Sequence, residues 1–109
     1  MNTNYRTEYS NEATKDRKNF NDYQLDQIDK AVRKVSKNPL PQNEGGLGKP
    51  LGHKFGLNLT GLCKITLKKL GIRVVYKLLR TETTIKIIVI ALRADEEVYK
   101  IAADRTDRE

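Results

Sequence analysis

Hydrophobic and polar positions follow two different spacings along this chain, and each spacing predicts a different kind of element. Residues 62–67 and 72–79 alternate apolar and polar side chains, and residues 85–92 are β-branched almost throughout, so we predict three strands. Residues 22–37 instead repeat apolar side chains at the spacing of an amphipathic helix. Because the connections between the three strands are short, antiparallel pairing is favoured.

Weaker patterns near the two ends complete the order of elements. Residues 5–9 alternate like a short strand, residues 11–20 form a polar helix, and residues 95–102 form a short helix with acidic residues in its first turn. Ser10 and Asp22 are candidate N-caps of the first two helices. The predicted order is β-α-α-β-β-β-α. This is an α+β fold in which a mostly antiparallel four-stranded sheet carries two N-terminal helices on one face, followed by a short C-terminal helix.

Length and composition exclude several classes of protein. The 109 residues suffice for one domain, which we place at residues 1–109. The longest apolar run, residues 87–92, is far shorter than the ~20 residues of a membrane-spanning helix, and residues 1–6 lack the apolar region of a secretory signal. One cysteine and one histidine make neither an internal disulfide nor a structural zinc site. We therefore expect a soluble, cytoplasmic protein without membrane, metal or cofactor.

Positive charge is concentrated in one segment of the sequence. The net charge is +7 with a pI near 9.6, and residues 45–81 contain eight lysines and arginines but no acidic residue. Such a segment attracts polyanions, which favours a nucleic-acid partner. An acidic protein would respond to the same field, and a basic surface that only aids solubility is the plain alternative. The glycine- and proline-rich connection at residues 39–56 is unusually long, which indicates a functional or mobile segment.

Alternation within the predicted strands gathers cations on one face of the sheet. Lys64, Thr66 and Lys68 share a face of one strand, and Arg73 and Lys77 share a face of the next. We expect this face to be free of helices and open to a ligand. Arginine and lysine suit a phosphodiester, because arginine binds phosphate oxygens in bidentate fashion and lysine supplies a point charge. The alternative is that these lysines form an ordinary solvated face.

Four residues are candidates for a chemical role, a structural role or both. Crowding by other cations is expected to lower the pKa of Lys64 and fit it for proton transfer. Tyr99 is suited either to stack on a base or to pack in the core below the last helix. His53 is a candidate general base, although a lone histidine in a loop is more often a bystander. Cys63 alternates with apolar residues and is expected to be a small core residue.

Several short motifs, weak individually, resemble one known family in their order and spacing. They are residues 5–10 at the start, the most specific stretch at 59–67, the segment 71–76, and Arg93 followed by residues 97–99. Together they resemble the RelE/ParE superfamily of bacterial toxins from type II toxin–antitoxin systems, within it the RelE-like mRNA interferases. The resemblance implies a sheet-and-helix toxin that enters the ribosomal A site and cuts mRNA. It also implies a cognate antitoxin as partner, besides the ribosome and mRNA.

The same resemblance assigns roles to residues of this chain. The family's reaction is attack of a ribose 2′-hydroxyl on the adjacent phosphate, giving a 2′,3′-cyclic phosphate and a 5′-hydroxyl. Lys64 matches a catalytic-surface lysine, Arg73 and Arg93 match phosphate-binding arginines, and Tyr99 matches a tyrosine that stacks or moves a proton. Thr66 departs from the pattern, because RelE has a second lysine there.

Other residues are expected to support this site. Lys68 and His53 are the candidates to substitute for the missing lysine. The basic residues expected to contact RNA are Lys54, Lys68, Lys69, Lys77 and Arg80.

Two other functions remain open from the sequence. A ParE-like toxin on the same fold would act on DNA gyrase without cutting RNA, and its basic residues would serve docking alone. A basic nucleic-acid-binding module without catalysis would need just the positive field, and its binding would depend steeply on salt.

Overall fold

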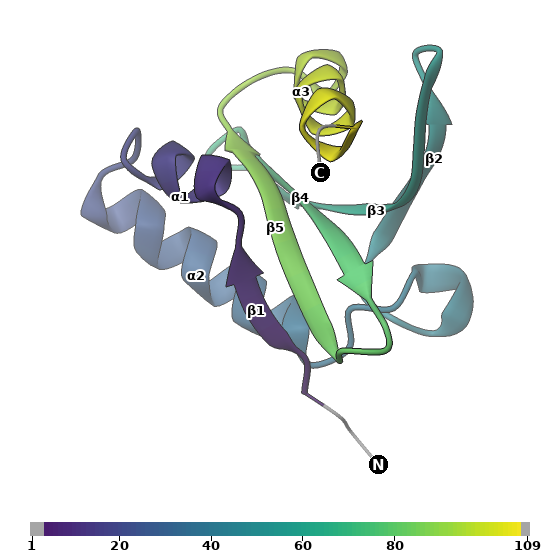
Figure 1. Cartoon of the computed structure of the whole chain (residues 1–109). Helices are drawn as coiled ribbons and strands as arrows, with labels where there is room; N and C mark the ends of the chain where they lie inside the picture. The colour runs from purple at the N-terminus through teal and green to yellow at the C-terminus, as the bar shows by residue number, and fades with distance from the viewer. Residues whose placement is uncertain (1–3, 108–109) are drawn as a thin grey trace.

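A computed structural model describes residues 4–107 of the chain (Figure 1). The two ends of the predicted domain, residues 1–3 and 108–109, lie outside the described residues. Within residues 4–107, no helix is long and apolar enough to cross a membrane. The elements in chain order are β1 (Arg6–Tyr9), α1 (Asn11–Arg17), α2 (Asp22–Ser36), a 3₁₀ helix (Gln42–Glu44), β2 (Lys49–Lys54), β3 (Leu57–Leu67), β4 (Ile72–Leu79), β5 (Thr84–Ala91) and α3 (Asp95–Asp107).

The strands form one mixed sheet in the order β1-β5-β4-β3-β2. The pairs β2–β3, β3–β4 and β4–β5 are antiparallel, whereas β1 runs parallel to β5 at the edge. The predicted α+β fold with a mostly antiparallel sheet is confirmed. The predicted number of four strands is wrong, because β2 lies inside the connection at residues 39–56. Pro50 and Gly52 are residues that disfavour a strand, so the sequence pattern does not indicate β2. The register of β2 with β3 shifts between these two residues.

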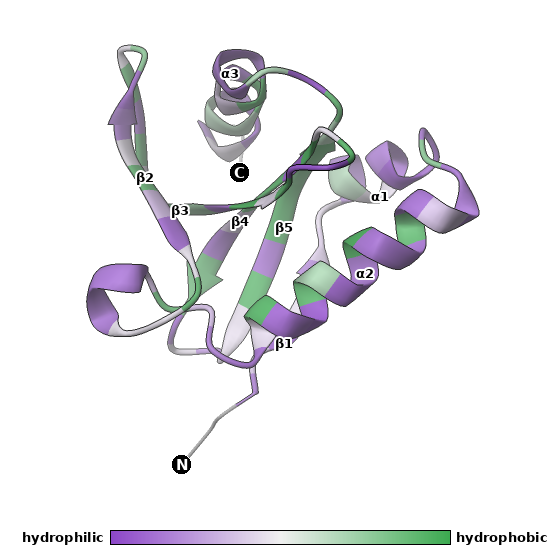
Figure 2. Cartoon of the chain, turned by 180° about the vertical axis from the view of Figure 1, so that it is seen from behind, coloured by the Kyte–Doolittle hydropathy of each residue, from purple (hydrophilic) through white to green (hydrophobic). Residues whose placement is uncertain are grey.

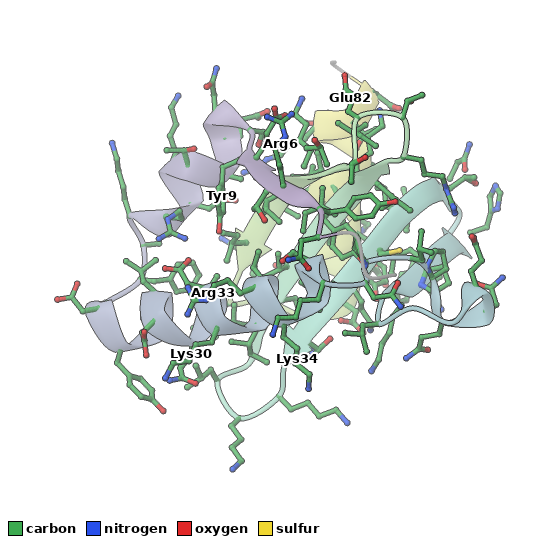
Figure 3. All side chains as sticks on the ribbon, turned by 90° about the horizontal axis from the view of Figure 1, so that it is seen from below. Arg6, Tyr9, Lys30, Arg33, Lys34 and Glu82 are labelled. Carbon is green, nitrogen blue, oxygen red and sulfur yellow. The ribbon has the colours of Figure 1, made fainter. Side chains whose placement is uncertain are left out.

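The two N-terminal helices cover one face of the sheet, as predicted. Ala13 of α1 and Ile28 and Val32 of α2 are buried in a core with Val74 of β4 and Ile87 of β5. Hydrophobic residues dominate β5 in Figure 2, in keeping with a strand that contributes to cores on both of its faces. The outer side of α2 carries the exposed side chains of Lys30, Arg33 and Lys34 (Figure 3).

The C-terminal helix covers the opposite face of the sheet. Val98, Tyr99 and Ala102 of α3 are buried in a second core with Val75 of β4 and Val89 of β5. The expectation that this face is free of helices is therefore wrong. The length of α3 predicted from the sequence is too short, because the last turns of the helix are polar and carry no apolar pattern. The helix extends to residue 107 rather than 102. A layer of helix thus lies on each side of the sheet (Figure 1).

The helix starts show how local chemistry fixes the boundaries. The Ser10 side chain accepts a hydrogen bond from the Ala13 amide, which confirms it as an N-cap of α1. Asp22 does not cap α2. Asn21 does, and it forms a capping box with Gln24 in which each side chain accepts from the other residue's backbone amide. Asp22 occupies the first turn instead.

One buried tyrosine fastens the connection between α2 and β2. The Tyr76 hydroxyl donates to the Pro39 carbonyl oxygen at 2.7 Å, and burial raises the pKa of Tyr76, so the hydroxyl stays protonated. Gly48 passes so close that an added Cβ would lie 2.3 Å from the Tyr76 oxygen. At the far end of β4, Arg80 binds Glu44 of the 3₁₀ helix through two hydrogen bonds of 2.9 and 2.6 Å. The long connection is therefore held in place at two points.

Candidate active site

The sheet and α3 together bring two predicted cations onto one carboxylate. Thr66 of β3 lies opposite Arg73 of β4, so Lys64 and Arg73 are diagonal neighbours on the face that α3 covers. Asp95, the first residue of α3, accepts a hydrogen bond from Lys64 Nζ at 3.3 Å and another from Arg73 Nε. A second Arg73 nitrogen donates to the Arg93 carbonyl oxygen at 2.7 Å. We call Lys64, Arg73 and Asp95 the cation cluster.

The cation cluster is half-buried beside an aromatic ring. The side chains of Lys64 and Arg73 are 21% and 25% exposed, so water reaches them without fully surrounding them. Lys64 Nζ lies 5.7 Å from the ring centre of Tyr99, within the range of a cation–π contact. Tyr99 itself is 1% exposed and belongs to the core. In this structure its ring therefore offers no free face for stacking on a base.

The opposite charges in the cation cluster stabilise one another. Burial works to lower the pKa of Lys64, but its interactions with Tyr99 and with Asp95 favour the ammonium and raise the pKa above the usual lysine value. The expectation of a lowered Lys64 pKa is wrong, because the carboxylate of Asp95 stands between the cations. Burial likewise works to raise the pKa of Asp95, but hydrogen bonds from Arg73 and Lys64 lower it. Lys64 and Asp95 are therefore both charged at neutral pH.

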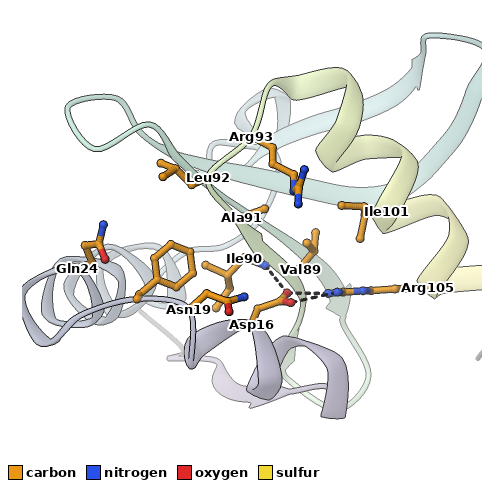
Figure 4. A pocket seen from close by; sticks show the side chains of 11 residues that line it. Asp16, Asn19, Gln24, Val89, Ile90, Ala91, Leu92, Arg93, Ile101 and Arg105 are labelled. Carbon is orange, nitrogen blue, oxygen red and sulfur yellow. Dashed lines mark hydrogen bonds and ion pairs between the residues drawn. The ribbon is translucent and has the colours of Figure 1, made fainter.

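The side chain of Arg93 points to a different part of the surface. Its guanidinium donates to Glu97 at 3.1 Å and is 58% exposed. It lines a pocket of about 470 Å³ between α1, β5 and α3 (Figure 4). Deeper in this pocket, Arg105 of α3 binds Asp16 of α1 at 2.7 Å, and Asp16 accepts from the Ile90 amide at 3.0 Å. Arg93 thus joins the cation cluster through its backbone carbonyl and not through its guanidinium.

The supporting residues predicted from sequence are spread over the molecule. Lys68 and Lys69 are exposed in the β3–β4 turn, whereas Arg80 lies at the other end of β4 and is bound to Glu44. Lys77 lies on β4, where it pairs with Leu62 and Lys86. His53 and Lys54 are exposed at the end of β2. The Thr66 hydroxyl is buried with no hydrogen-bond partner, and Cys63 is buried in the core as predicted.

Two residues of this region escaped the sequence analysis. The sequence showed Asp95 as one of three acidic residues in a helix's first turn, and nothing in its spacing marked it as the partner of distant strands. Phe55 lies at the tip of the hairpin between β2 and β3, and its ring centre is 5.9 Å from that of Tyr99. Because the sequence pattern did not indicate β2, it did not predict the hairpin that brings Phe55 next to Tyr99. Within residues 4–107, no group of three or more histidine, cysteine, aspartate or glutamate side chains is arranged to hold a metal ion.

Comparison with known proteins identifies the fold. No family model matches the sequence, and no curated protein matches it significantly. Among solved structures, a mutant of the Escherichia coli toxin RelE in its free state is similar over 94% of this chain and 98% of its own, with 20% identity and a TM-score of 0.72. The RelBE2 toxin–antitoxin complex from Mycobacterium tuberculosis matches with 21% identity over 87% of this chain and 100% of its own, at a TM-score of 0.65. The fold that the resemblance implied is therefore confirmed, and the chain has the fold of RelE toxins.

Proposed function

We propose that this chain is the toxin of a type II toxin–antitoxin module and an endonuclease that cuts mRNA in the ribosomal A site. The convergence of Lys64 and Arg73 on one half-buried point carries this proposal. Two cations from different strands meet there on a single anion, which is the arrangement that a backbone phosphate requires. The RelE fold and the acid-free basic segment at residues 45–81 support the same function.

The carboxylate of Asp95 marks where such a phosphate would bind. Its two oxygens accept from Lys64 and Arg73 in the way that two non-bridging phosphate oxygens would. A phosphodiester carries the same single negative charge and prefers the same donors. An incoming RNA backbone therefore competes with Asp95 for the cations. Arg73 is already oriented by the Gly71 and Arg93 carbonyl oxygens, so little reorganisation accompanies this exchange.

The proposed reaction is a transesterification within the RNA. The ribose 2′-hydroxyl gives its proton to water, and its oxygen forms a bond to phosphorus while the bond from phosphorus to the 5′-oxygen breaks. The departing 5′-oxygen takes a proton from Lys64, which regains one from water. Arg73 stabilises the charge that develops on the phosphate. Lys64, kept as an ammonium by Tyr99 and by the bound phosphate that replaces Asp95, is the proton donor for the 5′-oxygen. Tyr99 positions Lys64 from below.

The proposal extends to partners and place of action. One matching structure is the RelE mutant in complex with a peptide of the antitoxin RelB, and another is the intact E. coli RelBE complex. We infer that a cognate antitoxin also binds this chain. Action on mRNA in the ribosome places the toxin in the cytoplasm.

The test is induced expression in translating cells, with 5′ ends of mRNA mapped before and after induction. We expect growth arrest and new 5′ ends in phase with codons. Arg73→Gln should lower cleavage at those positions by about a hundredfold, the scale of losing one donor to a developing negative charge. Arg33→Gln, on the outer side of α2, removes the same charge away from the site and should leave cleavage unchanged.

Three results would contradict the proposal. Intact mRNA with arrested DNA supercoiling would indicate the ParE-like function. Intact mRNA and normal growth, at normal levels of folded protein, would leave a basic binding module. Equal cleavage by Arg73→Gln and Arg33→Gln would show that the cation cluster takes no part in the reaction.

A further inference from the structure

An aromatic residue stands at the tip of the hairpin beside the cation cluster. Lys54 of β2 pairs with Leu57 of β3, so Phe55 and Gly56 alone form the turn. Both turn residues have positive φ, 54° for Phe55 and 73° for Gly56. Two-residue hairpins with positive φ at both positions favour asparagine, aspartate or glycine at the first one. A phenylalanine there is a strained choice that the turn itself does not require.

The environment of Phe55 does not explain this choice by burial. The residue is 54% exposed, one of few large apolar side chains in the described part of the chain that face water. Its ring is tilted by 45° against Tyr99, with 5.9 Å between ring centres. The contact with Tyr99 covers only part of the Phe55 ring, because more than half of the residue remains exposed to water. Residues held in strained backbone conformations cluster at binding and active sites.

The position of Phe55 relates it to the proposed phosphate site. Tyr99 contacts both parts: its ring centre lies 5.9 Å from that of Phe55 and 5.7 Å from Lys64 Nζ. Lys64 in turn reaches Asp95, where the phosphate is proposed to bind. Phe55 is thus one aromatic ring away from the cation cluster. Exposed His53 and Lys54 precede it on the same hairpin.

We propose that Phe55 is a stacking platform for a nucleobase of the RNA whose phosphate occupies the cation cluster. This inference rests on the proposed function and adds a binding subsite to it. Single-stranded RNA is bound by combining cationic contacts to the backbone with aromatic rings under the bases, and such stacking tolerates any base because each has a π-face. Because Tyr99 is buried, the exposed ring of Phe55 takes the stacking role that the sequence suggested for Tyr99.

The chain offers a direct spectroscopic test, because it contains no tryptophan. Phe55→Trp introduces a single indole whose fluorescence reports on the hairpin tip. The probe is a short single-stranded oligoribonucleotide with 2′-O-methyl groups, which binds without being cut. We expect the RNA to quench the indole, whereas inorganic phosphate at saturating concentration leaves it unchanged because it has no base to stack.

Affinity measurements supply the second arm. Phe55→Leu should weaken binding of the same RNA between about 5- and 150-fold, the range for one lost base–aromatic contact, and Phe55→Trp should retain it. Tyr23→Leu is the matched control, because Tyr23 is also an exposed aromatic residue, 63% exposed, but lies on α2. Thermal unfolding of each variant shows that the domain remains folded. In translating cells, Phe55→Leu should likewise reduce cutting at the mapped positions.

The outcomes separate the subsite from the function on which it rests. If the unchanged protein binds and cuts RNA and Phe55→Leu does both equally well, the stacking platform is refuted and the nuclease function stands. An indole that responds equally to phosphate and to RNA would also refute stacking. If the unchanged protein neither binds the oligonucleotide nor cuts mRNA, both proposals fail together.

Discussion

A single carboxylate governs the charge of the candidate site. Asp95 binds both Lys64 and Arg73, and without it the two ammonium and guanidinium charges would face each other across the sheet surface. The carboxylate therefore has two opposed effects. It draws the cations together in the positions that a phosphate needs, and it reduces the positive field that attracts the phosphate.

The opposed effects of Asp95 predict a gain in RNA affinity when its charge is removed. Asp95→Asn should tighten binding of the uncleavable oligonucleotide and steepen its salt dependence by about one unit of log K against log salt, because one more cationic charge becomes available to phosphate. Fluorescence anisotropy across a salt series measures both quantities. Glu96→Gln is the control with the same charge change, since Glu96 pairs with Lys100 on the exposed side of α3. Equal effects of the two variants would show that Asp95 has no special relation to the site.

The elements differ in how far the sequence could predict them. The sequence predicts β4 from its alternating apolar residues and β5 from a nearly continuous β-branched run, which reflects burial on both faces. It predicts α2 because one stripe of apolar residues faces the core. Strand β2 is missed because an edge strand with Pro50 and Gly52 carries no alternation of apolar and polar residues.

The residues of the site differ in the same way in how far the sequence could predict their positions. Lys64 and Arg73 could be placed on one face from their period-two spacing, whereas Asp95 and Phe55 reach them through α3 and the hairpin, whose positions depend on tertiary packing.

The attachment of α3 to the rest of the fold depends on a polar contact as well as on its apolar side. Arg105 binds Asp16 and also donates to the Ile88 carbonyl oxygen at 2.9 Å, while Asp16 accepts from the Ile90 amide (Figure 4). These side chains therefore form hydrogen bonds with backbone groups of β5 that lie beyond the segment paired with β1. The pair is 17% and 13% exposed at Arg105 and Asp16, so water does not readily replace either partner.

Breaking this contact should loosen α3 measurably. Arg105→Met keeps the apolar stem and removes the charge, and we expect a loss of about 3 kcal/mol in the free energy of unfolding, the lower end of the range for a broken buried ion pair. Lys100→Met, which breaks an exposed pair on the same helix, should cost under about 1 kcal/mol. Urea unfolding of the two variants gives the comparison. A similar small loss for both would mean that apolar packing alone holds α3.

At the scale of the whole molecule, the basic charge extends well beyond the cation cluster. Lys68 and Lys69 in the β3–β4 turn belong to the acid-free segment at residues 45–81, and Lys30 and Lys34 of α2 line a groove with them. The field of such an array acts on any polyanion, whereas the cation cluster is proposed to bind one phosphate. Under the proposed function, RNA affinity and RNA cleavage therefore have separate origins, and each can be altered without the other.

The separation predicts a variant that binds RNA more weakly and cuts it at the same places. Lys68→Gln combined with Lys69→Gln should lower the salt dependence of RNA binding by about two units of log K against log salt, one for each lost phosphate contact, and weaken binding of all sequences alike. The mapped cleavage positions should stay the same, because the turn supplies charge and no group of the cation cluster. Lys15→Gln with Lys18→Gln removes equal charge from the region of α1, outside the basic segment, and should change the slope less. Altered cleavage positions in the Lys68/Lys69 variant would instead show that the turn takes part in choosing the phosphate that reaches Arg73.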